Sequence, residues 1–166
     1  MRRILIVFIY FALVSIASES GLSAQQASAS LTVNATVTKN CTISTTPVAF
    51  GNYDPVVANA TTPLDGQGGV TVTCTKGAIA SVGLNVGSYP AGGRRMFAGA
   101  NAFLPYELYK DTTRTQLWGN DSGTDFDIPA APDRNPRTYQ VFGRVLAAQD
   151  AAVGNYADTV VATVNF

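Results

Sequence analysis

The stretch NYADTVVATVNF, Asn155 to Phe166, ends the printed sequence and decides how the fold is completed. From position 160 onward, apolar side chains alternate with a mixed set. The apolar set is Val160, Ala162, Val164 and Phe166. A period of two is typical of a β-strand with one buried face. Because no turn or partner strand follows, we expect a strand with an open edge, which native proteins cover.

Strand patterns recur along the chain, and helical periodicity is missing. Alternation or β-rich composition predicts strands in the following segments: Ala29–Val37, Val48–Phe50, Gly69–Cys74, Ala78–Val86, Phe103–Tyr109, Thr138–Ala147 and Asp158–Phe166. Turn-forming runs such as FGNYDP, PLDGQGG and YPAGG separate them. GQGG lies before a strand, so it is no phosphate loop. Short strands with this spacing predict an all-β chain, an immunoglobulin-like antiparallel β-sandwich that is left incomplete.

The first residues have the pattern of a secretory signal peptide. Arg2 and Arg3 precede the thirteen-residue apolar run Ile4–Ile16, and small residues lead to Ala24. A membrane anchor is the alternative, but a spanning helix needs about 20 apolar residues. We therefore expect a signal peptide at 1–24, an N-terminal strand extension at 25–38 and one sandwich domain at 39–166.

The charge balance argues against two classes of partner. The chain has eleven basic and eleven acidic residues and no histidine. Removal of the leader takes away Arg2, Arg3 and Glu19, which leaves nine basic and ten acidic residues. A near-neutral chain has no basic field to hold nucleic acid or anionic lipid. We expect no nucleic-acid partner, and contact with a membrane only during export.

Cys41 and Cys74 are the only cysteines. An even pair in an exported chain predicts one disulfide, because oxidising compartments allow such bonds. The closed loop would stabilise the fold by roughly 4 kcal/mol on the chain-entropy account. A metal site is the alternative, but two distant cysteines without histidine make a poor ligand set. We expect no metal and no cofactor.

The segment Ala29–Val37 has its own apolar face and is joined to Cys41 by only three residues, TKN. It can cover the open edge of its own domain or that of a neighbour, and the short connection favours the neighbour. Contacts made head-to-tail do not close on themselves and build open fibres. Strand addition of this kind supplies backbone hydrogen bonds and pockets for alternate side chains.

Six motifs, in order, resemble those of the spore coat protein U family, which includes Csu-type archaic chaperone–usher pilus subunits. They are ATVTKNCTI, FGNYDP, VTCTKG, GGRRM, LPYELYKDTTRTQLWG and GNYADTVVATVNF. The resemblance spans Leu31 to the C-terminus. It implies a secreted fibre subunit whose sandwich is completed by donor-strand complementation. The subunit would reach the cell surface through the periplasm and support adhesion and biofilm formation.

The resemblance also implies partners and roles for particular residues. A periplasmic chaperone would first lend a strand, and an outer-membrane usher would exchange it for the next subunit's N-terminal strand. The donor side chains would be Leu31, Val33, Ala35 and Val37. The acceptor groove would include Val160, Ala162, Val164 and Phe166, and the carboxylate of Phe166 would anchor to basic residues of the chaperone. Cys41 and Cys74 match the disulfide of the family.

Catalysis has little support in the sequence. Without histidine, a Ser–His–acid or Cys–His device is excluded, and we expect no catalytic residue and no enzyme. Asp121, Asp125 and Asp127 lie close together, but their order differs from that of a known calcium loop. A solvated turn is our interpretation, and a bound cation stays open.

Two other groups of residues have structural interpretations. Arg94 and Arg95 make too small a basic spot for nucleic acid and are expected in a hairpin or beside acids. Six aromatic residues suggest a sugar-binding platform, although packing explains most of them: Tyr53, Tyr106, Tyr109, Trp118, Tyr139 and Phe142.

Two functional alternatives stay open. One is a spore or cyst coat protein of the same family, assembled without a pilus. The other is a monomeric, lectin-like secreted sandwich. The sequence does not separate a rod subunit from a minor adaptor subunit, and it names no receptor.

Overall fold

Eight β-strands build the part of the chain that the computed structural model describes, residues 24–166. They are β1 (Cys41–Ala49), β2 (Leu64–Cys74), β3 (Ala80–Leu84), β4 (Arg94–Phe97), β5 (Phe103–Tyr109), β6 (Phe126–Ile128), β7 (Arg137–Val145) and β8 (Ala162–Asn165). This described part contains no helix, and hence none that could cross a membrane. The signal-peptide prediction falls mainly on residues 1–23, which lie outside it.

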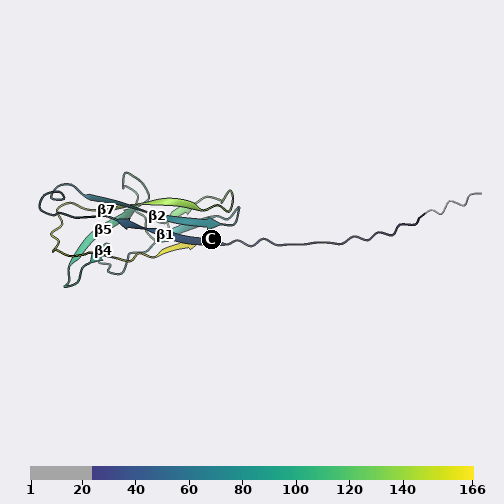
Figure 1. Cartoon of the computed structure of the whole chain (residues 1–166), viewed down its shortest axis with the longest axis horizontal. Coiled ribbons are helices and arrows are strands. Elements are labelled where there is room, and N and C mark those ends of the chain that lie inside the picture. Colours follow the sequence, from purple (N-terminus) through teal and green to yellow (C-terminus); the bar gives the residue numbers. More distant parts are fainter. Residues whose placement is uncertain (1–23) are drawn as a thin grey trace, which may run out of the picture. The chain divides into compact units, whose positions relative to one another are not determined.

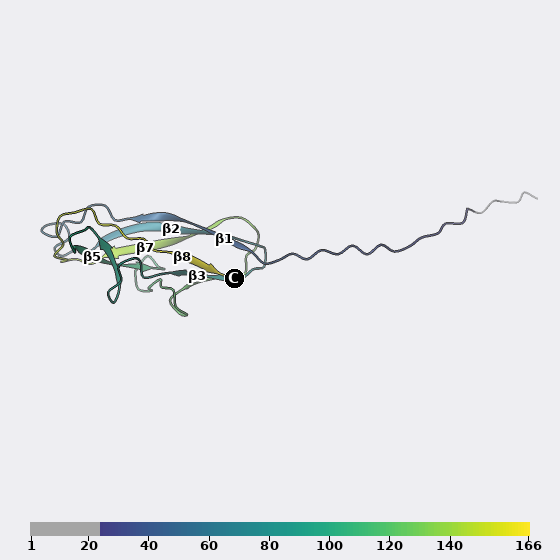
Figure 2. The same ribbon diagram turned by 90° about the horizontal axis from the view of Figure 1, so that it is seen from below.

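The strands form two antiparallel sheets. The larger sheet has the order β1-β2-β7-β5-β4, and the smaller one has the order β6-β3-β8. The strands of the larger sheet are labelled in Figure 1, and in Figure 2 β2 and β7 lie on one side of the fold and β3 and β8 on the other. The prediction of an all-β, antiparallel sandwich is therefore confirmed.

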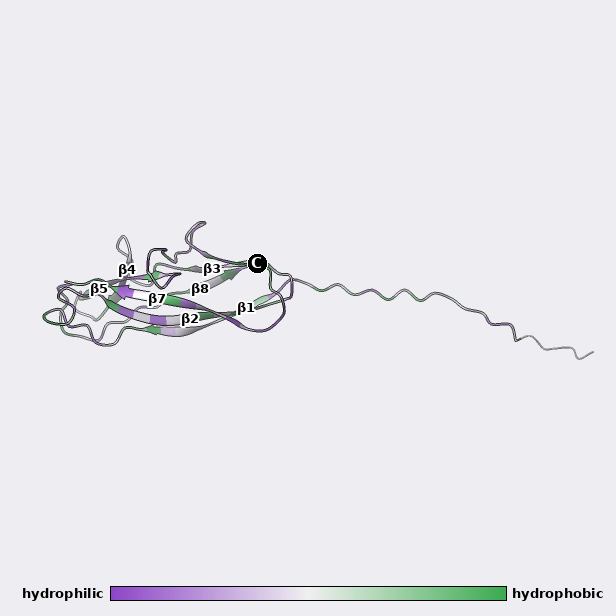
Figure 3. Cartoon of the chain, turned by 90° about the horizontal axis from the view of Figure 1, so that it is seen from above, coloured by the Kyte–Doolittle hydropathy of each residue, from purple (hydrophilic) through white to green (hydrophobic). Residues whose placement is uncertain are grey.

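Alternating side chains from both sheets fill the space between them. Val70 and Val72 of β2 are 1% and 2% exposed, and Val82 of β3 is fully buried. Hydrophobic and hydrophilic residues alternate in bands along the larger sheet (Figure 3). Trp118 is also fully buried, and its indole Nε1 donates a hydrogen bond of 2.8 Å to the Val82 carbonyl. Both sheets thus share one core.

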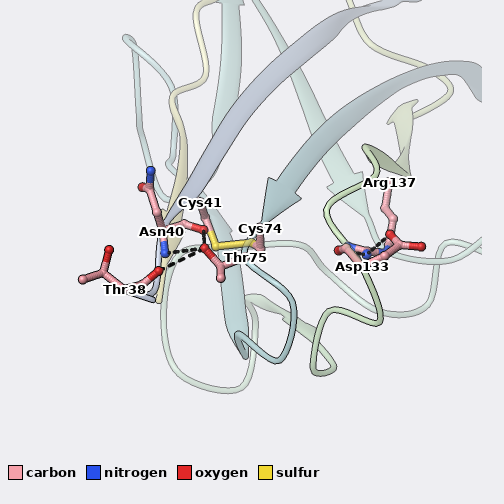
Figure 4. Close-up of a disulfide and its surroundings, with 7 residues drawn as sticks. All are labelled: Thr38, Asn40, Cys41, Cys74, Thr75, Asp133 and Arg137. Atoms are coloured by element: carbon pink, nitrogen blue, oxygen red, sulfur yellow. Dashed lines mark hydrogen bonds and ion pairs between the residues drawn. A yellow bond between two sulfur atoms is a disulfide. The ribbon is translucent and has the colours of Figure 1, made fainter. Parts of the chain in front are cut away.

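The predicted disulfide is present, and it joins the first residue of β1 to the last residue of β2. Cys41 and Cys74 are also direct partners in the register of the two strands. Beside them, the Asn40 N–H donates to Thr75 Oγ1 at 3.1 Å, and Thr75 Oγ1 donates to the Thr38 carbonyl at 3.2 Å (Figure 4). Covalent and hydrogen bonds therefore fix the entry of the chain into β1.

The glycine-rich run GQGG was expected before a strand, and the structure corrects this position. The GQGG run lies inside β2, which begins at Leu64, and not before a strand. Cβ atoms on Gly68 and Gly143 would lie 2.7 Å from Val48 Cγ2 and 2.6 Å from Phe50 Cζ. These glycines therefore leave room for the end of β1 to fold onto β2 and β7.

β3 and β8 are both shorter than predicted. β3 spans Ala80–Leu84, so the predicted strand Ala78–Val86 was too long at both ends, and the Val86 side chain beyond it is 54% exposed. The chain leaves the strand direction there because Gly87 adopts a φ of +81°, which only glycine adopts without strain. β8 begins only at Ala162.

The N-terminal segment forms no strand in this structure. Residues 24–40 have no assigned strand, although alternation predicts one over Ala29–Val37. The side chains of Leu31, Val33 and Val37 are 88%, 83% and 83% exposed. A β-strand is defined by a ladder of backbone hydrogen bonds to a neighbouring strand, and no such ladder is assigned to residues 29–37.

Candidate functional site: an open groove between the sheets

Two edge strands face each other on one side of the sandwich. β1 is the outermost strand of the larger sheet, and β8 is the outermost strand of the smaller sheet. Within residues 24–166, each of them pairs with a strand on one side only, and the two lie in contact across the sandwich. Backbone groups on their free edges can therefore accept a further strand.

A groove of about 480 Å³ opens where β1 and the chain entering β8 diverge. Its first wall is Thr45–Val48, and its second wall is Tyr156–Val160 together with Ala162. Between these walls, the floor includes Leu84, Met96, Tyr106, Leu108 and Val141. The floor is almost wholly apolar, so it suits apolar side chains better than a charged or sugar ligand.

A second hollow of about 660 Å³ continues the groove. The two hollows share Val48, Phe50, Met96 and Tyr156. The second is also lined by the loops 51–55 and 151–155. The opening is therefore elongated, as a site for an extended segment must be, and differs from a closed small-molecule pocket.

Two aromatic rings shape the middle of the groove. The Phe50 and Tyr106 rings meet edge to face, with their centroids 5.9 Å apart. The Tyr106 hydroxyl donates a hydrogen bond of 2.7 Å to the Asp158 carboxylate. Burial, and then this carboxylate, raise the pKa of Tyr106 well above its ordinary value. The hydroxyl therefore stays neutral and remains a donor.

The four predicted groove residues lie at different places. Val160 and Ala162 line the groove. Val164 is half-buried against the core but does not line either hollow, and Phe166 is 47% exposed. The structure thus brings together the first two of the four.

Sequence reasoning missed the opposite wall and the floor. The first wall continues to Phe50, which also lines the groove. It ends in the apolar run Val48–Phe50, which was predicted only as a short strand. Its alternation is interrupted, because the register of β1 against β2 shifts between Thr46 and Ala49. The sequence signal for this wall is therefore the VAF run followed by a glycine. The floor residues look like any other core residues.

The acidic cluster lies away from the groove. Asp121 begins a turn in which its carbonyl accepts hydrogen bonds from the N–H groups of Thr124 and Asp125, and Asp127 lies in β6. In residues 24–166, no group of three His, Cys, Asp or Glu side chains is placed to hold a metal ion.

The arginine and aromatic predictions have structural outcomes. Arg94 lies in the β4–β5 hairpin, is 5% exposed and forms an ion pair with Glu107 at 3.3 Å, as predicted. Trp118, Tyr106 and Phe142 are buried. The other three aromatic residues, Tyr53, Tyr109 and Tyr139, are half-buried. Packing therefore accounts for most of this set.

Comparisons with known proteins agree with this architecture. Residues 27–163 match the Spore Coat Protein U domain. The chain is 39% identical over 166 residues to Protein U of Myxococcus xanthus, with 92% of each chain covered. It is also similar to a chain in the crystal structure of the CsuC–CsuE chaperone–tip adhesion subunit pre-assembly complex from the archaic chaperone–usher Csu pili of Acinetobacter baumannii. That match has 26% identity and a TM-score of 0.57, and it covers 79% of this chain and 41% of the other. The chain therefore belongs to the Spore Coat Protein U domain family.

Proposed function

We propose that this protein is a structural subunit of a chaperone–usher pilus, a secreted surface fibre. In this proposal, each subunit inserts its N-terminal strand into the groove of the next. The family match and the likeness to a Csu subunit support the assignment. The observation that carries the proposal is the apolar groove between two unpaired strand edges.

The N-terminal extension 25–38 has the properties that this groove needs. Leu31, Val33, Ala35 and Val37 alternate with polar residues, so a strand here presents one apolar face. Their burial would contribute on the order of 5–8 kcal/mol before any backbone hydrogen bond is counted. The backbone would then pair with the free edges of β1 and β8.

Assembly of such a fibre requires two further partners. A periplasmic chaperone would first lend a strand to the groove. An outer-membrane usher would then exchange that strand for the N-terminal strand of the next subunit. The Phe166 carboxylate would anchor the chain to the chaperone. The matched crystal structure is itself a complex with a chaperone. Adhesion and biofilm formation would be properties of the finished fibre.

The role we propose is structural and involves no catalysis. The family and the fold are those of pilus and coat subunits. The groove floor offers packing surface, and Asp158, the one carboxylate residue that lines the groove, already accepts three hydrogen bonds.

A matched pair of variants tests the donor strand. Val33→Asp places a charge on the apolar face of the strand, and Asn34→Asp places the same charge on the other face. Because adjacent strand residues point to opposite faces, Val33→Asp should block polymerisation and Asn34→Asp should permit it. Light scattering and electron microscopy of the purified protein measure this. Equal effects of the two variants would contradict the donor assignment.

Moving the strand gives a second test. A chain without residues 25–38 should be unstable or insoluble, because its groove stays empty. Fusion of SASLTVNATVT, Ser28–Thr38, after Phe166 through a flexible linker should restore a stable monomer. A truncated chain as stable as the full chain would contradict the proposal.

A coat function is the second candidate, and a specific observation favours it. The matching domain is the Spore Coat Protein U domain, and Protein U is similar over nearly the whole chain. The same groove would then join subunits of a spore or cyst coat. Genes for a chaperone and an usher beside this one would favour the pilus.

A further inference from the structure

The second wall of the groove is not part of a regular strand. Ala157 forms an isolated bridge with Phe97, and β8 begins only at Ala162. The residues between them lack a strand ladder, yet Asp158, Thr159 and Val160 line the groove. Something other than sheet pairing must therefore keep this wall in position.

Asn85 holds the end of the wall next to β8. Its backbone N–H donates to the Val161 carbonyl at 3.1 Å, and its side-chain Oδ1 accepts from the Val161 N–H at 2.9 Å. The same Oδ1 accepts from the Gly87 N–H at 3.0 Å. Arg94 Nε donates to the Asn85 carbonyl at 2.9 Å, which fixes the backbone of Asn85. One amide side chain thus continues the pairing of β3 with β8.

Asp158 holds the middle of the wall. Its Oδ1 accepts from the N–H groups of Ser88 and Thr159, both at 2.8 Å, and its Oδ2 accepts from the Tyr106 hydroxyl at 2.7 Å. Ser88 belongs to the connection between β3 and β4, and Tyr106 belongs to the floor. The carboxylate therefore ties the wall to both sheets.

The neighbouring glycine shows how closely this carboxylate is packed. A Cβ atom on Gly87 would collide with the Asp158 carboxylate. Three donors hydrogen-bond the two carboxylate oxygens, so an apolar strand laid across the groove would leave both oxygens hydrogen-bonded. The hydrogen bonds of Asp158 can therefore persist both when the groove is empty and when a strand covers it.

We propose that Asp158 and Asn85 are positioning residues for strand capture. They hold the second wall in its binding geometry before the strand arrives, so that little ordering remains to occur on binding. This inference rests on the proposed function, because it assumes that the groove receives a strand. It concerns the wall rather than the residues that touch the strand's apolar side chains.

Release of a synthetic strand tests the inference. The full chain carrying Val33→Asp, which keeps its own strand out of other grooves, is refolded with a fluorescent Ser28–Thr38 peptide. An excess of unlabelled peptide is added, and fluorescence anisotropy follows the release. Asp158→Ala should release the peptide about tenfold faster, as the loss of hydrogen bonds to a charged group implies. Asn85→Ala should change the rate in the same direction.

A conservative variant and a matched control separate positioning from general stability. Asp158→Asn keeps an acceptor for Ser88 and Thr159, so it should recover most of the slow release. Asp150→Asn makes the same chemical change at an exposed loop position and should release the peptide at the parent rate. In the Asp158→Ala complex, hydrogen exchange should accelerate at the Ser88 and Thr159 amides and remain slow in β2 and β7.

The possible outcomes are distinct. If Asp158→Ala does not fold, Tyr106→Phe still removes one donor and keeps the ring, and release should be about threefold faster. Release at the parent rate in every variant of Asp158, Asn85 and Tyr106 would overturn the inference and leave the proposed function intact. A parent chain that does not retain the peptide would overturn both.

Discussion

The two walls of the groove are built by different means. β1 pairs with β2 over most of its length, and a disulfide closes the pair at Cys41. The opposite wall has only the four-residue strand β8 and a segment held by the side chains of Asn85 and Asp158. The strand β1, which carries the first wall, is therefore held by backbone and covalent bonds, and the second wall depends on a few polar contacts. Changes to the two walls should have different consequences.

The largest effect is expected from breaking the disulfide at the start of β1, the strand that carries the first wall. Replacement of both Cys41 and Cys74 by Ser should lower the free energy of unfolding by roughly 4 kcal/mol, because the unfolded chain is no longer constrained by the loop. Urea denaturation of the self-complemented chain measures this. Reduction of the unmutated protein should give the same loss, and a much smaller loss in both would contradict the expectation.

A matched pair of valines compares the closed core with the groove. Val72 on β2 is 2% exposed, whereas Val160 lines the groove and is half-buried. Val72→Ala should cost about 2–3 kcal/mol of unfolding free energy because it leaves a cavity in a closed core. Val160→Ala should cost less than about 1 kcal/mol in the open chain, meaning the full chain that carries Val33→Asp, and more in the self-complemented chain, where a strand covers it. Equal costs in the open chain would show that the groove is already closed.

Two glycines in the same connection separate strain from collision. Gly87 and Gly92 both have positive φ, +81° and +74°, but only Gly87 has the Asp158 carboxylate beside it. Gly92→Ala should cost about 1 kcal/mol from backbone strain alone. Gly87→Ala should cost about 2 kcal/mol and also weaken strand binding, since it displaces the carboxylate. Thermal unfolding and peptide release measure the two effects.

The smallest effect is expected on the solvent side of the closed sheet. Arg144 Nε and Nη2 donate to Asp65 at 2.7 and 2.9 Å, and Arg114 lies 3.2 Å from the same carboxylate. The Arg144 hydrogen bond is the main cause that lowers the pKa of Asp65. Because the folded pKa is below the unfolded one, this stability is present above the unfolded pKa and is lost as the pH falls through the folded pKa.

Asp65→Asn should therefore lower the free energy of unfolding at pH 7 by at most about 1 kcal/mol, because solvent screens this partly exposed group. The difference should shrink as the pH falls through the folded pKa. Urea titrations at pH 7 and at successively lower pH check this, and Asp150→Asn is the control. A difference that persists in acid would mean that Asp65 acts through packing rather than charge.

Local alternation was enough to predict part of the fold. Thr–Val alternation placed the second half of β2, and the prediction for Phe103–Tyr109 matches β5 residue for residue. Most of β1, and the short strands β4 and β6, were not predicted. The all-β class followed in the same way, and the disulfide followed from the single pair of cysteines in an exported chain. The limits of β3 and β8 could not be predicted in this way. Regular pairing ends there because the Asn85 side chain accepts the hydrogen bond of the Val161 N–H and because Gly87 has a positive φ. Polar contacts between distant segments produce no periodic pattern in the sequence, so they cannot be predicted from alternation.

The groove itself was predicted only in part. Val160 and Ala162 were identified by their alternation, whereas the wall at Thr45–Phe50 spans a shift of register that interrupts the alternation. Tyr106 and Met96 line the floor because β4 and β5 bring them there, and nothing in their neighbourhoods distinguishes them from core residues. The groove is an unfilled space between segments that are distant in the sequence, so the residues of its first wall and floor can be identified only from the structure.

The position of the disulfide has a mechanical consequence. Tension applied to the chain at Asn40 would reach the domain at the Cys41–Cys74 pair, where β1 would otherwise begin to peel from β2 one hydrogen-bonded pair at a time. The cross-link sits at that first pair and passes the load directly into β2, at the end where its neighbour β7 begins. The protein should therefore resist being unzipped from its leading end, and reduction should make it yield at lower force.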